Sequence, residues 1–146
     1  MRILGIDYGS RRIGLAVSDP LGITAQGVQT LFRKNIASDM KEIRDLIDEK
    51  DVVEVVVGLP KNMNNTLGEK AKEVLKFIES LKTHISIPIK MFDERLSTVI
   101  GIRALNEANL SGKKRKKKID MVAAQIILQG YLDMEKSIGQ NDESPI

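Results

Sequence analysis

The chain has 146 residues, of which 42% are hydrophobic, and this is enough for one domain with one buried core. Its 23 Lys and Arg residues outnumber 20 Asp and Glu residues, yet six of the cations form one run, leaving 17 against 20 elsewhere, so the positive charge is local. No cysteine, signal sequence or apolar run of membrane-spanning length is present, so we expect a soluble, cytoplasmic protein without a membrane partner.

Three strands are predicted in the first 32 residues, because short apolar or alternating runs are separated by turn signals. They cover residues 2–7, 13–19 and 23–32, with "YGSRR" as the first turn and "DPLG" as the second. Two short connections of this kind predict an antiparallel meander.

After the meander, apolar residues recur at the spacing of amphipathic helices, and β-branched runs lie between them. Each strand then follows a helix, which is typical of parallel crossovers. We predict helices at 36–50, 69–82, 97–109 and 119–137, and strands at 52–60 and 87–92.

The element order predicts an α/β fold with a mixed five-stranded sheet, three antiparallel strands followed by parallel crossovers, and helices on both faces. This order is compatible with a ribonuclease H-like fold and with other small α/β arrangements. We expect one domain over residues 1–138 and a flexible C-terminal tail over 139–146.

Asp7 is the first candidate site residue, because it ends the first apolar strand, and ligands gather at the ends of central strands in α/β sheets. The competing interpretation is a turn aspartate that bonds its own backbone. Asp19 is a rival carboxylate, but it closes the return strand and should lie roughly 20 Å from Asp7 at about 3.3 Å per residue.

The second candidate lies in "FDERLST", where Asp93 and Glu94 end the fifth strand. Successive strand residues point to opposite faces, so only one of the two acids is expected to face Asp7, and the spacing does not decide which. An ordinary salt bridge from either acid to Arg95 or Lys90 is the alternative.

Asp120 is the third candidate, in the first turn of the predicted last helix. A carboxylate there is favoured by the helix dipole whether or not it takes part in chemistry. Ala123 and Ala124 form a small-residue face beside it that would let this helix approach the sheet closely.

Three carboxylates at two strand ends and a helix start are predicted to converge on Mg²⁺ or Mn²⁺, which prefer hard oxygen ligands. Two such ions would support phosphodiester cleavage.

The basic run before the last helix opposes the helix dipole, so we expect it to form a loop that holds a phosphate backbone. Few aromatic residues are present to stack single-stranded bases, which favours duplex or folded nucleic acid. The predicted nucleic-acid-binding residues are Arg11, Arg12, Arg95, Lys113, Lys114, Arg115, Lys116, Lys117 and Lys118.

Four segments, "ILGIDYGSRRIGLAVSD", "VVVGLP", "MFDERLST" and "IDMVAAQIILQGYL", resemble the YqgF/RuvX family of ribonuclease H-like proteins in the family's order. The resemblance implies a cytoplasmic nuclease associated with 5′-end maturation of pre-16S ribosomal RNA, and earlier proposed as a Holliday-junction resolvase. It also implies that Asp7, Glu94 and Asp120 are the family's catalytic, metal-binding acids.

The chain departs from the family after "VGLP", where an Asp-Gly pair is usual but "KNMNNTLG" stands here. Asn64 and Asn65 would be weaker Mg²⁺ ligands than a carboxylate, or would serve as turn formers.

A Holliday-junction resolvase and a non-catalytic RNA-binding assembly factor remain as alternative functions, and the protein would act as a monomer or a homodimer. An actin-like ATPase or sugar kinase is disfavoured, because such folds need a second domain.

Overall fold

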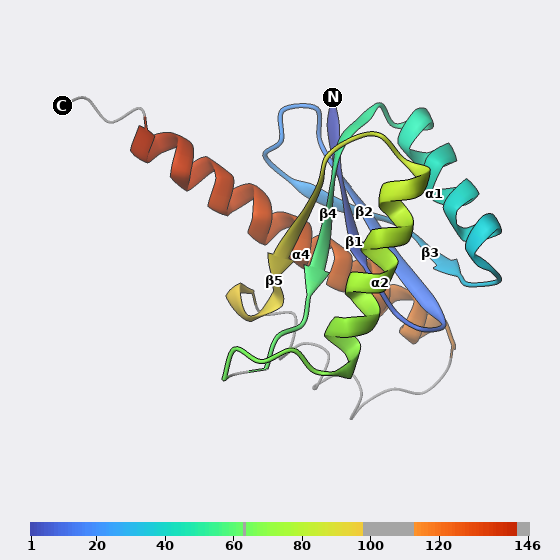
Figure 1. Ribbon diagram of the computed structural model, residues 1–146. Coiled ribbons are helices and arrows are strands. Elements are labelled where there is room, and N and C mark those ends of the chain that lie inside the picture. The colour runs from blue at the N-terminus through green and yellow to red at the C-terminus, as the bar shows by residue number, and fades with distance from the viewer. Residues whose placement is uncertain (63, 98–112, 143–146) are drawn as a thin grey trace.

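The computed structural model describes all residues except 63, 98–112 and 143–146 (Figure 1). Its helices and strands follow the predicted order. They are β1 (Arg2–Asp7), β2 (Arg12–Ser18), β3 (Ala25–Phe32), α1 (Ile36–Glu49), β4 (Val52–Leu59), α2 (Glu69–His84), β5 (Ile89–Asp93), the short 3₁₀ helix η1 (Glu94–Leu96) and α4 (Lys113–Asp142).

The five strands form one mixed sheet in the order β3-β2-β1-β4-β5. β1 pairs antiparallel with β2, and β2 with β3, whereas β4 runs parallel to both β1 and β5. Figure 1 shows α1 and α2 over one face of the sheet and α4 crossing the other. The predicted mixed sheet with helices on both faces is therefore confirmed.

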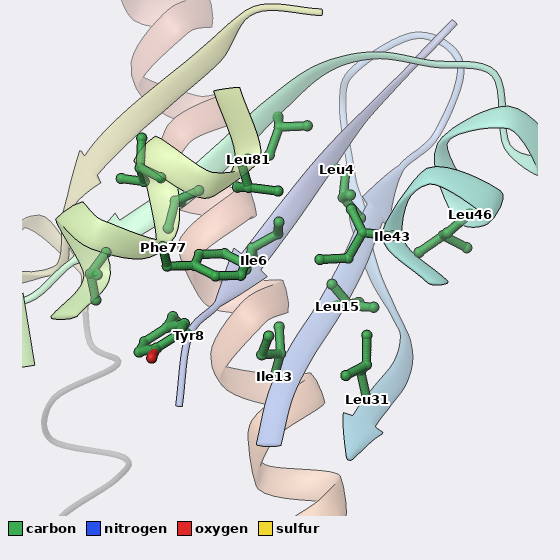
Figure 2. Packing of buried hydrophobic residues seen from close by; sticks show 14 of the residues in the cluster. Leu4, Ile6, Tyr8, Ile13, Leu15, Leu31, Ile43, Leu46, Phe77 and Leu81 are labelled. Atoms are coloured by element: carbon green, nitrogen blue, oxygen red, sulfur yellow. The ribbon is translucent and has the colours of Figure 1, made fainter. Parts of the chain in front are cut away.

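The larger core lies between the sheet and the two helices α1 and α2 (Figure 2). It forms because alternate strand residues point to this face, while each helix presents an apolar stripe. Asn35 caps α1 by accepting a hydrogen bond from the Ser38 amide at 2.9 Å. The buried side chains include Leu4, Ile6, Ile13, Leu15, Leu31, Ile43, Leu46, Phe77 and Leu81.

The opposite face carries small residues, which let α4 lie close to the strands. Ala123 and Ala124 are buried there, as predicted. A Cβ added at Gly5 would lie 2.7 Å from the Leu128 Cβ, and one at Gly14 would lie 2.0 Å from the Asp120 carbonyl oxygen. Real Cβ atoms do not approach other atoms this closely, so glycine at these strand positions sets how near α4 comes.

β3 begins at Ala25, two residues later than the predicted Ile23. The Asp19 carboxylate is the cause, because it accepts hydrogen bonds from the backbone amides of Leu21, Ile23 and Thr24 at 2.7–3.2 Å. These bonds close a turn and lower the pKa of Asp19, chiefly through the Thr24 amide. Asp19 is thus a turn-forming residue.

The prediction that the basic run forms a loop was wrong, because α4 begins at Lys113 and not at Ile119. Lys and Arg have good intrinsic helix propensity, which favours helix formation along the run. The dipole cost of about 0.3–1 kcal/mol per charge applies only to the first turn. Asp120 consequently lies about two turns inside the helix, so the dipole does not account for its position.

α4 also extends to Asp142, beyond the predicted end at Ser137, so residues 139–142 of the expected tail are helical. The predicted helix over 97–109 lies outside the described residues, apart from Ser97, which forms a bend after η1. None of the helices in the described part is both long enough and apolar enough to cross a membrane.

We expect Gly14→Ala to destabilise the protein, because the new methyl group would meet the Asp120 carbonyl, a backbone atom that cannot rotate away. Overpacking of this kind costs about 1–3 kcal/mol or more, measurable as a lower urea midpoint. Gly68→Ala is the matched control, since its methyl group meets only the Asn62 side chain, 3.5 Å away. Equal midpoints for the two variants would contradict the proposed close approach of α4.

Candidate active site

Three residues form a row across the sheet, at the end of β1, near the start of β2 and near the end of β4. Asp7 of β1 pairs with Gly14 of β2, and the parallel register that joins Ile6 to Val57 brings Gly58 of β4 to its other side. Paired residues on neighbouring strands point to the same face and lie about 5 Å apart. Asp7, which is 8% exposed, therefore faces α4 with a glycine on each side.

Asp120 lies directly over the first of these glycines. Its backbone occupies the space that a Gly14 side chain would need, with the carbonyl oxygen 2.0 Å from the Cβ position. Its carboxylate, 19% exposed, accepts a hydrogen bond from the Arg12 Nε at 2.6 Å. α4 thus brings the third predicted acid to the strand beside Asp7, where Arg12 pairs with it.

Glu94 lies over the second glycine. A Cβ at Gly58 would be 3.2 Å from the Glu94 Cγ, and the Glu94 side chain is only 1% exposed. Glu94 belongs to η1 and directly follows Asp93, the last residue of β5. Phe92 of β5 packs against α4, and Glu94, two residues further on, lies on that same face of the sheet, which is also the face of Asp7.

Asp93 takes a different role, which resolves the choice between the two acids of "FDERLST". Its carboxylate accepts hydrogen bonds from the Arg95 backbone amide at 3.0 Å and from the Arg95 Nη2 at 2.6 Å. The Arg95 guanidinium holds the pKa of Asp93 below its ordinary value, and the Asp93 side chain in turn raises the pKa of Arg95. The salt-bridge alternative therefore describes Asp93, and Glu94 lies toward Asp7.

Arg95 also joins η1 to the loop between β4 and α2. It donates to the Asn62 carbonyl at 3.1 Å and to the Asn65 Oδ1 at 3.0 Å. Asn65 has a φ of 67°, a left-handed conformation that Asn adopts more readily than most residues. Asn64 accepts a hydrogen bond from the Thr66 hydroxyl. Asn64 and Asn65 therefore shape the turn that Arg95 holds in place.

Sequence reasoning missed a network under the β1–β2 turn. Arg33 donates from Nη1 to the Tyr8 hydroxyl at 2.7 Å and from Nε to Asp39 at 3.2 Å, with its guanidinium 5.0 Å from the Tyr8 ring centroid. Asp39 is 2% exposed and also accepts from the Lys34 amide. The available signal was an acid on the buried stripe of α1, next to Met40. This network fixes the residue that follows Asp7.

A family model described as "RuvX: Holliday junction resolvase" matches residues 1–134. The chain belongs to the RuvX family. It is 57% identical over 133 residues to a Clostridium botulinum (strain Hall) protein named "Putative pre-16S rRNA nuclease", covering 91% of this chain and 97% of that one. A Clostridium acetobutylicum protein of the same name is also 57% identical, with 91% and 98% covered. The predicted family is confirmed.

Solved structures support the fold of this RuvX family member. Thermus thermophilus RuvC in complex with a Holliday junction substrate superposes with a TM-score of 0.56 at 13% identity, covering 93% of this chain and 96% of that one. A second structure of the same protein gives 0.56 at 12% identity, with 94% and 97% covered. At this identity the likeness shows the fold alone, and it confirms the predicted ribonuclease H-like arrangement.

The carboxylates of this RuvX protein suit a hard divalent cation in donor chemistry, because each offers only oxygen. In the part of the chain that the structure describes, however, no three Asp, Glu, His or Cys side chains are grouped tightly enough to hold a metal ion as they stand. One of the three acids, Asp120, is engaged by Arg12. A metal site formed by Asp7, Glu94 and Asp120 thus requires rotation of side chains on a backbone that already brings them to one row.

We expect Asp93→Asn to lower the stability of the protein at neutral pH, because the amide loses the charge that pairs with Arg95. Since the pKa of Asp93 is lowered on folding, its contribution is fully present above the unfolded pKa of about 3.9. It is lost as the pH falls through the lower folded pKa. Urea denaturation from pH 7 to pH 2.5 should therefore show the gap between wild type and variant closing below about pH 4.

Asp45→Asn is the control for this measurement, because Asp45 forms an exposed ion pair with Lys41 on α1, and its side chain is 63% exposed. Exposed pairs contribute little, so this variant should stay close to wild type at every pH. A gap for Asp93→Asn that does not depend on pH would mean that packing, rather than the ion pair, is what the substitution disturbs.

Proposed function

We propose that the protein is a metal-dependent endonuclease that hydrolyses phosphodiester bonds in structured nucleic acid, with 5′-end processing of pre-16S ribosomal RNA in the cytoplasm as its main task. The observation that carries the proposal is the row of Gly14, Asp7 and Gly58, over which Asp120 and Glu94 converge. Family membership and the name of the clostridial relatives support the substrate.

Asp7, Glu94 and Asp120 are the residues that we assign to a divalent ion, Mg²⁺ or Mn²⁺. Nucleases with a RuvC-like fold generally need divalent metal ions. When bound, such an ion lowers the pKa of a coordinated water and offsets charge on the phosphate. The protein's part is to hold three carboxylates at one edge of the sheet, two of them almost wholly shielded from solvent.

Cations around this row are suited to the nucleic-acid backbone. Arg11 is exposed in the β1–β2 turn, and Arg12 follows it at the start of β2. The run Lys113–Lys118 forms the first turns of α4, the same helix that carries Asp120. Phosphates held by these cations would lie close to the acids.

A four-way DNA junction is the second candidate substrate, because the family model carries the description of a Holliday junction resolvase. The cations recognise backbone phosphates, and phosphates are common to RNA and DNA. The two substrates are therefore best separated by direct comparison. Binding to either without cleavage would instead support a non-catalytic assembly factor.

We expect Asp7→Asn to lower cleavage of a 5′-extended pre-16S RNA fragment by at least about a hundredfold in Mg²⁺ or Mn²⁺. The reason is that metal ions contribute several kcal/mol of charge stabilisation, and about 1.4 kcal/mol corresponds to a factor of ten. Cleavage rates should be measured on this RNA and on a four-way DNA junction in parallel. Asp45→Asn is the control for a carboxylate charge that is lost away from the site. Equal cleavage by Asp7→Asn and wild type would contradict the assignment of the site.

Replacing all six cations from Lys113 to Lys118 with Gln should weaken binding of an RNA duplex and flatten its dependence on salt. Each phosphate contact that is lost reduces the slope of log affinity against log salt by roughly one. We therefore expect the slope to fall by several units in anisotropy titrations between about 50 and 200 mM salt. An unchanged slope would show that the run does not contact the nucleic acid.

A further inference from the structure

We propose that Arg12 exchanges partners during substrate binding: a divalent ion replaces it at Asp120, and the released guanidinium binds a phosphate of the nucleic acid. This inference rests on the proposed function and adds a coupling between the two ligands. Its starting point is the ion pair itself, in which the Arg12 Nε lies 2.6 Å from an Asp120 carboxylate oxygen.

The main chains of both residues are fixed, so only side chains are left to move. The Asp120 backbone is seated over Gly14, where the space for a Cβ is filled. Arg12 pairs with Phe32 in the sheet, and the Arg33 amide donates to the Arg11 carbonyl at 2.9 Å. The exchange is therefore a rotation of side chains that leaves the fold unchanged.

The ion pair is placed where a metal ion can compete for it. The Arg12 and Asp120 side chains are 29% and 19% exposed, so solvent and dissolved ions reach the pair. In the absence of metal, the +1 charge of Arg12 offsets part of the negative charge of the three carboxylates at the row. A divalent ion offers twice that charge and several coordination positions, so it is the stronger partner for Asp120.

Once released, the guanidinium has a suitable second partner in the substrate. Arginine keeps its charge at all physiological pH values and binds phosphate through a planar, forked set of donors. Arg12 stands beside Arg11 at the site edge, where the nucleic-acid backbone would approach. A metal ion should therefore raise the affinity for nucleic acid, and nucleic acid should raise the affinity for the metal by the same factor.

The test measures binding of Mn²⁺ alone to the full chain by electron paramagnetic resonance, which counts free and bound ions without any cleavage. We expect Arg12→Gln to bind Mn²⁺ about three to ten times more tightly than wild type, because no guanidinium competes for Asp120. Arg11→Gln removes the same charge one residue away and should stay within about twofold of wild type. Arg12→Lys keeps the charge at position 12, and it should bind Mn²⁺ no more tightly than wild type.

The second measurement is the affinity of each variant for a phosphorothioate-linked RNA hairpin, with and without Mn²⁺ at constant ionic strength. Mn²⁺ should raise this affinity about fivefold or more in wild type and in Arg11→Gln, and less than twofold in Arg12→Gln. Equal Mn²⁺ affinity and equal coupling in wild type and Arg12→Gln would overturn the exchange while leaving the nuclease proposal intact. If wild type and Asp7→Asn bind Mn²⁺ equally, the proposed metal site and the exchange both fail.

Discussion

The close approach of α4 to the sheet is the constraint on which the site depends. Glycine at positions 5, 14 and 58 removes three side chains from one face of β1, β2 and β4, and α4 and Glu94 occupy the space that is left. Larger residues at these positions would lift the helix, and Asp120 would move away from Asp7 with it. The interior is packed too tightly to absorb such a shift locally. The packing of α4 against the sheet therefore also determines where the acids of the site lie.

Contacts on the opposite face of the sheet, which α1 and α2 cover, also fix the position of the site. Tyr8 follows Asp7 and points into the larger core, where its ring lies 4.8 Å from that of Phe77. Its hydroxyl accepts from Arg33, whose guanidinium is held in turn by the buried Asp39. Because neighbouring strand residues point to opposite faces, fixing Tyr8 on one side also fixes Asp7 on the other. The network of Arg33 and Asp39 thus holds Tyr8 on one face of the sheet, while α4 packs on the other face, toward which Asp7 points.

The fold could be predicted because its signals, apolar periodicity and turn residues, are local, and Asp7 was singled out because it ends a strand. Spacing left the choice between Asp93 and Glu94 open, because the run "IPIKMF" does not show which face Phe92 takes. In the structure Phe92 packs against α4, and Glu94 shares its face. The start of α4 was misjudged because the dipole of the first turn was given more weight than the propensity of Lys and Arg. Arg33 was missed because its partners are 25 and 6 residues away.

The early start of α4 changes how the basic run relates to the acids. In a loop, the six cations would be tied to Asp120 only by a flexible chain, whereas in a helix the backbone of the run and that of Asp120 belong to one rigid element. That element is held against the sheet at Gly14 and again, further along, at Tyr131, which donates a hydrogen bond to Glu54. Burial, and then the Glu54 carboxylate, raise the pKa of Tyr131 above its ordinary value. Under the function that we propose, a phosphate bound at the start of α4 would therefore be positioned relative to Asp7 by the geometry of one helix, although the contact itself does not depend on base sequence.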